Sequence, residues 1–187
     1  MKTFRKTIAV LAAALLIGIA AAAALADPPN RPATSNAQLA KRVRHELLML
    51  PYYGVFDNLA YNINGNTVTL YGQVVRPTTR SDAERAVKRL PGVARVVNNI
   101  HVLPLSSFDD SVRTATYRAI ARTGGLHRYL MGANPSLHIV VDRGHVTLEG
   151  VVSNKGDRTL AYIAANGVPG VFSVTNNLRV DGEGTLR

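Results

Sequence analysis

Apolar positions along the chain follow two periods, and the same succession of periods occurs twice. In the first half, Leu39, Val43 and Leu47 are spaced as on one face of a helix, and alternation at every second residue follows over 59–63 and 68–74. A second helical stripe over 83–90 and a last strand over 93–102 complete the series. This order predicts an α+β unit, αββαβ, with both helices packed on one face of a three-stranded sheet.

The chain repeats itself when it is shifted by 78 positions. Residues 59–102 then align with residues 137–180 without a gap, and 16 of the 44 aligned positions are identical. The period is too long for a solenoid repeat, so each copy is expected to be a domain with its own core. The predicted organisation is a signal peptide at 1–26, a linker at 27–35, a first αββαβ domain at 36–104, a second αββαβ domain at 105–181 and a C-terminal tail at 182–187.

Polar residues mark the expected ends of the helices and the tight turns. Asn36 is expected to cap the first helix, which Pro51 ends, and Asp109 is expected to cap the corresponding helix of the second copy. Turns that tolerate positive φ are expected at 64–66 and 142–144.

Residues 1–26 have the three parts of a secretory signal peptide. Lys2, Arg5 and Lys6 form a basic start, an apolar stretch covers residues 8–20, and a small-x-small motif ends at Ala26. The sequence therefore predicts export and cleavage after Ala26. An uncleaved membrane anchor is the alternative, because a run of this length could just span a bilayer.

Composition narrows the classes of partner and of site. The chain has no cysteine, which excludes disulfides, cysteine-based metal sites and a lipid anchor on an N-terminal cysteine. Its 22 Lys and Arg exceed its 12 Asp and Glu, giving a net charge of +10, or +7 without the three cations of residues 1–26. A basic excess favours an anionic partner, and export makes nucleic acid the least expected one.

An enzyme is not expected. The five histidines do not recur in register between the two copies, and the sequence has no G-x-S-x-G motif, no cysteine nucleophile and no Gly-rich phosphate loop. No cofactor and no metal site are predicted.

The repeated residues resemble those of the BON-domain family (bacterial OsmY and nodulation). The matching features are the Val-Thr-Leu-x-Gly-x-Val strand at 68–74, Arg80 and Ala83 of the next helix, and the Pro-Gly-Val segment with its following strand at 91–102, all of which recur 78 residues later. The resemblance implies a periplasmic or envelope protein linked to osmotic or envelope stress. It also implies attachment to phospholipid membranes rather than catalysis.

Two repeated residue types are expected to have packing roles. Gly72 and Gly150 lie in mid-strand at core-facing positions, where a side chain is expected to collide with a crossing helix. Asn98 and Asn176 lie on the apolar face of the last strand, where a half-buried amide is expected to hydrogen-bond nearby backbone.

The second helices of the two copies differ in surface character. Where the first copy has Asp82, Glu84 and Arg85, the second has Leu160, Tyr162 and Ile163. These three apolar residues predict an interface, which could face the first domain, another subunit or a bilayer surface.

The segment around the end of the second copy's first helix is the predicted lipid-binding site. This helix is basic, and the loop after it is five residues longer than its counterpart. Apolar residues that insert beside arginines suit an anionic membrane surface, although the same apolar residues could simply cover the end of the core. The expected lipid-binding residues are Arg118, Arg122, Arg128, Tyr129, Leu130 and Met131. The resulting hypothesis is peripheral binding to anionic phospholipid, and the alternative is a module that contacts an envelope protein.

Overall fold

The computed structural model describes residues 33–182. The expected signal peptide (1–26) and its cleavage position lie outside the described residues. Within the described part of the chain, no helix is long and apolar enough to cross a bilayer.

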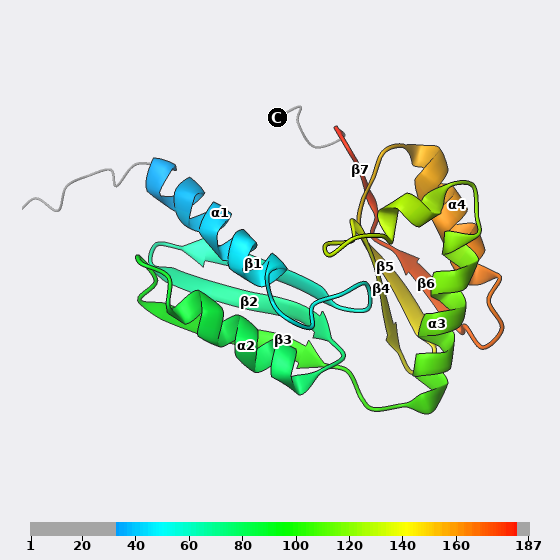
Figure 1. Cartoon of the computed structure of the whole chain (residues 1–187), viewed down its shortest axis with the longest axis horizontal. Helices are drawn as coiled ribbons and strands as arrows, with labels where there is room; N and C mark the ends of the chain where they lie inside the picture. The colour runs from blue at the N-terminus through cyan, green and yellow to red at the C-terminus, as the bar shows by residue number, and fades with distance from the viewer. Residues whose placement is uncertain (1–32, 183–187) are drawn as a thin grey trace, which may run out of the picture. The chain divides into compact units, whose positions relative to one another are not determined.

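The first repeat has the predicted order of elements (Figure 1). The β1 and β2 strands pair antiparallel, and β2 and β3 pair parallel, so the sheet order is β1-β2-β3. The helices α1 and α2 lie on the same face of this sheet. The elements are α1 (Ala33–Leu48), β1 (Asn58–Asn64), β2 (Thr67–Val74), α2 (Pro77–Lys88) and β3 (Arg95–Val102).

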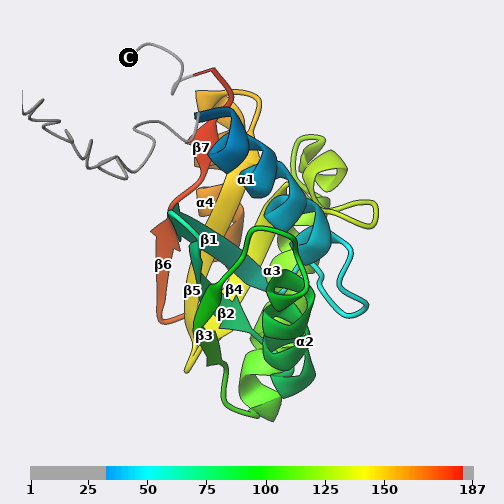
Figure 2. The ribbon, with the colours of Figure 1, turned by 90° about the vertical axis from the view of Figure 1, so that its left-hand side faces the viewer.

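The second repeat has the same order, with its last strand divided in two. Both β6 and β7 pair parallel with β5, which also pairs antiparallel with β4. Figure 2 shows β4, β5 and β6 side by side. The elements are α3 (Ser107–Ala121), the short 3₁₀ helix η1 (Leu126–Tyr129), β4 (Leu137–Asp142), β5 (His145–Val152), α4 (Lys155–Asn166), β6 (Ser173–Asn176) and β7 (Arg179–Val180).

Each repeat has its own apolar core between its sheet and its helices. The first core includes the predicted stripe Leu39, Val43 and Leu47 of α1. The second includes Val112 and Ile120 of α3 at the corresponding positions. The predicted α+β class, with two tandem αββαβ units, is confirmed.

The predicted helix caps are wrong in both repeats. The α1 helix already begins at Ala33, so Asn36 lies inside its first turn. In the second repeat Ser106 caps α3, and its Oγ accepts a hydrogen bond from the backbone N of Asp109 at 3.1 Å. The Asp109 carboxylate instead accepts the backbone N–H groups of Arg143 (3.0 Å) and Gly144 (2.8 Å) in the turn between β4 and β5.

The repeated glycines allow two strands to approach closely, which corrects the expected collision with a helix. Both Gly72 and Gly150 have φ of +119°, and a Cβ on either would overlap the backbone of the preceding strand. At Gly150 this Cβ would overlap the carbonyl of Ser136 and lie 3.3 Å from the Cα of Leu137. The obstacle is backbone, which cannot move aside as a helix side chain could.

The repeated asparagines hydrogen-bond backbone, as predicted. Asn98 Nδ2 donates to the Arg80 carbonyl (3.1 Å), and Asn176 Nδ2 donates to the Arg158 carbonyl (3.0 Å). Each Oδ1 accepts the N–H of the residue two positions further along its own chain segment, at 3.2 Å. Each amide therefore ties the second helix of its repeat to the last strand.

Residues 53–57 of the first repeat pack against β4 of the second, a contact that the sequence did not predict. The carbonyl of Val55 accepts the N–H of Ile139 at 2.7 Å, and the ring of Phe56 meets that of Tyr117 edge-on at 6.2 Å. Alternating apolar residues at 137, 139 and 141 predict a strand buried on one side only, and this is wrong for β4, because its first five residues are all buried.

The imidazole of His138 is enclosed by this contact. Its Nδ1 lies 3.2 Å from the carbonyl of Gly54 and its Nε2 lies 3.4 Å from the hydroxyl of Tyr53. A carbonyl can only accept, so Nδ1 carries the proton and Nε2 accepts from Tyr53. Burial lowers the pKa of His138 below 6.5 and raises the pKa of Tyr53 to about 12.

Replacement of Gly150 by alanine should destabilise the second domain by about 2–5 kcal/mol, the sum of the cost of a positive φ and of overpacking. Chemical denaturation followed by circular dichroism measures the change. Gly167→Ala is the matched control, because Gly167 has a φ of −81° and its nearest neighbour would lie 3.5 Å from the new Cβ. Equal stability of the two variants would contradict the close approach of β4 and β5.

The depressed pKa of His138 should make stability fall as the pH is lowered. Below pH 6.5 the unfolded chain takes up a proton that the folded chain resists, so stability is lost from about pH 6.5 downward. Burial raises the pKa of Asp57, so this carboxyl is protonated more readily in the folded chain than in the unfolded chain. Its titration therefore increases the stability of the fold as pH falls, which opposes the effect of His138. Denaturation midpoints at pH 7 and pH 5 should therefore differ less in His138→Gln than in the wild type. The same pH dependence of stability in both proteins would show that the buried imidazole of His138 does not cause it.

Candidate membrane-binding surface

Two of the predicted lipid-binding arginines lie on the outer side of α3. Arg118 and Arg122 are both exposed, and neither forms an ion pair within residues 33–182. Being four residues apart, they share one side of the helix. By contrast, Arg113 is buried, and its Nη2 donates to the carbonyl of Val141 at 2.7 Å.

The next three predicted residues all form contacts within the domain, although the side chain of Arg128 is 48% exposed. Tyr129 and Leu130 are only 6% and 4% exposed, because η1 folds the longer loop over the end of the core. The hydroxyl of Tyr129 donates to Asp157 at 2.5 Å, and Arg128 Nη2 donates to the same carboxylate at 2.6 Å. Tyr129 and Leu130 are therefore too buried in this fold to insert into a membrane as expected. Met131, the sixth predicted residue, is 63% exposed.

The predicted apolar interface on α4 is exposed, and part of it reaches the end of α3. Leu160, Tyr162 and Ile163 are 38%, 39% and 59% exposed. Leu160 and Ile163 are three residues apart and share a side of α4, whereas Tyr162 points elsewhere. A Cβ on Gly124 would lie 3.3 Å from Leu160 Cδ1, so Leu160 lies beside the segment that directly follows Arg122.

The end of α3 and the apolar residues of α4, which the sequence predicts as two separate groups, meet where Gly124 lies beside Leu160. We call Arg118, Arg122, Leu160 and Ile163 the helical face of the second domain. It combines two cations without acidic partners and two exposed aliphatic side chains.

The carboxylates of α3 and α4 leave the helical face positive. Asp109 is 1% exposed and Asp157 is 7% exposed, each accepting several hydrogen bonds. Asp110, in the first turn of α3, forms an ion pair with Arg113. These are the three acidic residues in the two helices, so no carboxylate there is free to neutralise Arg118 or Arg122.

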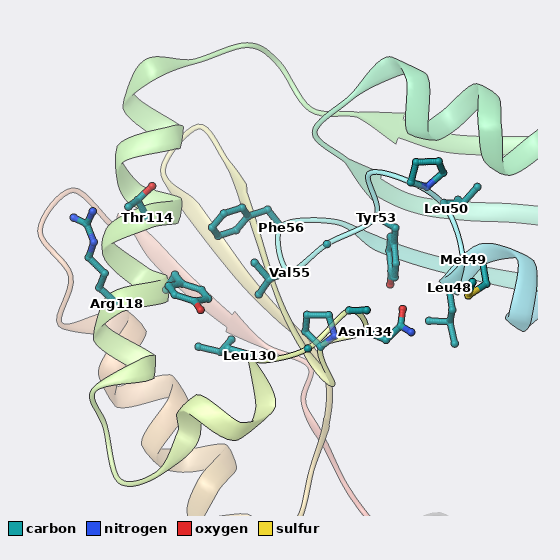
Figure 3. A pocket seen from close by; sticks show the side chains of 16 residues that line it. Leu48, Met49, Leu50, Tyr53, Val55, Phe56, Thr114, Arg118, Leu130 and Asn134 are labelled. Carbon is teal, nitrogen blue, oxygen red and sulfur yellow. The ribbon is translucent and has the colours of Figure 1, made fainter.

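A cavity of about 850 Å³ lies where residues 53–56 approach α3 (Figure 3). Its walls are mainly apolar and include Leu48, Phe56 and Leu130, with Arg118 at the edge. The Arg118 side chain points away from the hollow in Figure 3. The lining contains no histidine, cysteine or carboxylate, so it offers an apolar surface rather than acid–base chemistry. The described residues also contain no cluster of three potential metal ligands.

Comparison with known proteins places the chain in a family. The model of the BON domain matches twice, over residues 35–104 and 109–182. No curated protein sequence is significantly similar to the chain. Two solved structures of CdsD, a structural protein of the type III secretion system of Chlamydia trachomatis, are similar. The structure of the CdsD C-terminal domain is 13% identical in sequence to this chain. The match covers 76% of this chain and 96% of the CdsD chain, with a TM-score of 0.32. The second CdsD structure is 15% identical, and the match covers 79% of this chain and 95% of the CdsD chain, with a TM-score of 0.28.

The two family matches coincide with the two αββαβ repeats and together cover most of the chain. BON domains are binding domains that generally associate with membranes or lipids, in proteins that are generally periplasmic or attached to the envelope. The chain belongs to the BON-domain family and carries two copies of the domain in tandem.

Proposed function

We propose that this protein is exported to the periplasm and binds anionic phospholipid surfaces peripherally through its second BON domain. The observation that carries the proposal is the helical face, which combines the exposed Arg118 and Arg122, without an ion pair among residues 33–182, with Leu160 and Ile163, which are exposed on the neighbouring α4. The family's link to osmotic and envelope stress supports a protective role at the membrane.

The chemistry of the helical face suits the boundary between head groups and acyl chains. An arginine near an anionic surface contributes about 1 kcal/mol. Apolar side chains add about 25 cal/mol for each Å² that leaves water. Two cations and two aliphatic residues therefore support reversible, salt-sensitive attachment rather than permanent anchoring. Met131 adds exposed apolar surface in the following loop, whereas Tyr129 and Leu130 are buried in the core of the domain and the exposed Arg128 is paired with Asp157.

A contact with an envelope protein is the second candidate. Tyr162 favours it, because this residue is 39% exposed and lies on a different side of α4 from Leu160. An apolar protein contact would depend little on salt or on lipid charge.

Replacement of Arg118 and Arg122 together by glutamine should weaken binding to vesicles containing phosphatidylglycerol by about 30-fold, since two contributions of about 1 kcal/mol are lost. Co-sedimentation of the protein without residues 1–26 measures the affinity. Raising the salt concentration should weaken the wild type more than the variant.

The matched control is Arg42→Gln with Arg44→Gln, which removes the same charge from exposed positions of α1. This control should bind nearly as well as the wild type. Equal losses in both double variants would indicate diffuse attraction without a dedicated surface. Unchanged binding in both would reject the lipid proposal and favour a protein contact.

A further inference from the structure

A second exposed apolar cluster lies at the other end of α3. Leu105 is 95% exposed, Phe108 46% and Phe172 69%. The rings of Phe108 and Phe172 stack with their centroids 5.8 Å apart. We call these three residues the apolar cluster.

The backbone beneath the apolar cluster is fixed by hydrogen bonds. The buried carboxylate of Asp109 holds the N–H groups of Arg143 and Gly144, and the carbonyl of Gly144 accepts the N–H of Phe172 at 2.9 Å. A Cβ on Gly144 would lie 2.7 Å from the Phe172 ring, so the turn and the ring are in close contact. The two phenylalanines are therefore held in place while remaining open to solvent.

The first repeat has no equivalent cluster. Shifted by 78 positions, Phe172 corresponds to Ala94 and Arg143 to Gly65. The first repeat forms the same sheet and core without these side chains. The apolar cluster is therefore not required by the fold, and an exposed patch of this kind indicates a contact.

Phe108 of the apolar cluster and Arg122 of the helical face lie on the same side of α3. Phe108 and Arg122 are 14 residues apart, which places them close to one line along the helix and about 21 Å apart. The α4 helix runs beside this line, because Gly124 approaches Leu160 and Gly170 approaches Phe108. Phe108 and Leu160 thus lie near opposite ends of the α3–α4 pair.

We propose that the apolar cluster is a second point of insertion into the same anionic bilayer, so that α3 lies parallel to the membrane plane. The inference rests on the proposed function. Charge complementarity supports a membrane as the occupant, since the exposed Arg143 borders the phenylalanines and Arg118 and Arg122 face outward along the helix. The Nε of Arg143 is 3.7 Å from Asp142, a weak and solvent-exposed pair that phosphate can displace.

The absence of tryptophan in the chain gives a direct test. Phe172→Trp places the chain's single tryptophan in the apolar cluster, and Tyr71→Trp places it instead at a residue of β2 in the first domain that is 42% exposed. Each variant is mixed with phosphatidylglycerol–phosphatidylcholine vesicles with and without brominated acyl chains. Trp emission of Phe172→Trp should shift to the blue and be quenched by bromine, whereas Tyr71→Trp should show neither change.

Phe108→Trp is an independent second probe and should behave as Phe172→Trp does. Phe108→Ala with Phe172→Ala should weaken vesicle binding about tenfold through the loss of inserted apolar area. If vesicles bind while both cluster probes stay unquenched, the apolar cluster does not insert and the proposed function still stands. If no variant binds vesicles, both proposals fail. A blue shift that appears without vesicles and grows with protein concentration would instead identify a contact between protein molecules.

Discussion

Two buried aspartates fix the ends of the helical layer on which the second domain's surface depends. Asp109 joins the start of α3 to the turn between β4 and β5 by accepting two backbone N–H groups. At the other end, Asp157 joins the first turn of α4 to η1 by accepting from Tyr129 and Arg128. A buried carboxylate with charge-assisted hydrogen bonds is strongly bound in position, and losing its partners would leave a costly unpaired group. The apolar cluster and the helical face are therefore presented by a rigid frame.

The two repeats share the residues that make the fold and differ in the residues that face solvent. Both have a glycine where two strands approach and an asparagine that ties a helix to the last strand. Only the second repeat has phenylalanines beside its β-turn and exposed aliphatic residues on its second helix. This division is consistent with one common architecture in which the second copy carries the membrane contact.

Periodicity and the internal repeat were enough to predict the αββαβ order, because both depend on local spacing. The backbone role of Asn98 was predictable for the same reason, since a polar residue on an apolar face must find a nearby partner. The packing of residues 53–57 on β4 was not predictable, because it joins segments about 85 residues apart that no periodicity or repeat relates.

The sequence predicted only part of the candidate site. Arg118, Arg122, Leu160 and Ile163 were identified, but their proximity depends on how α4 lies beside α3. For Tyr129 and Leu130 the sequence left two alternatives, insertion into a membrane or covering of the end of the core. The structure favours the second, because η1 folds the loop inward. Phe108 and Phe172 are 64 positions apart, and only the fold brings their rings together.

In the function proposed above, the second domain meets the bilayer with the side formed by α3 and α4. The most direct test is a set of amide NMR spectra of the protein without residues 1–26, recorded with anionic bilayer discs that contain a lipid spin-labelled at its head group. We expect strong line broadening for residues 107–122 and 155–172, with α1 and α2 largely unaffected. Broadening centred on α1 and α2, or spread evenly over both domains, would contradict it.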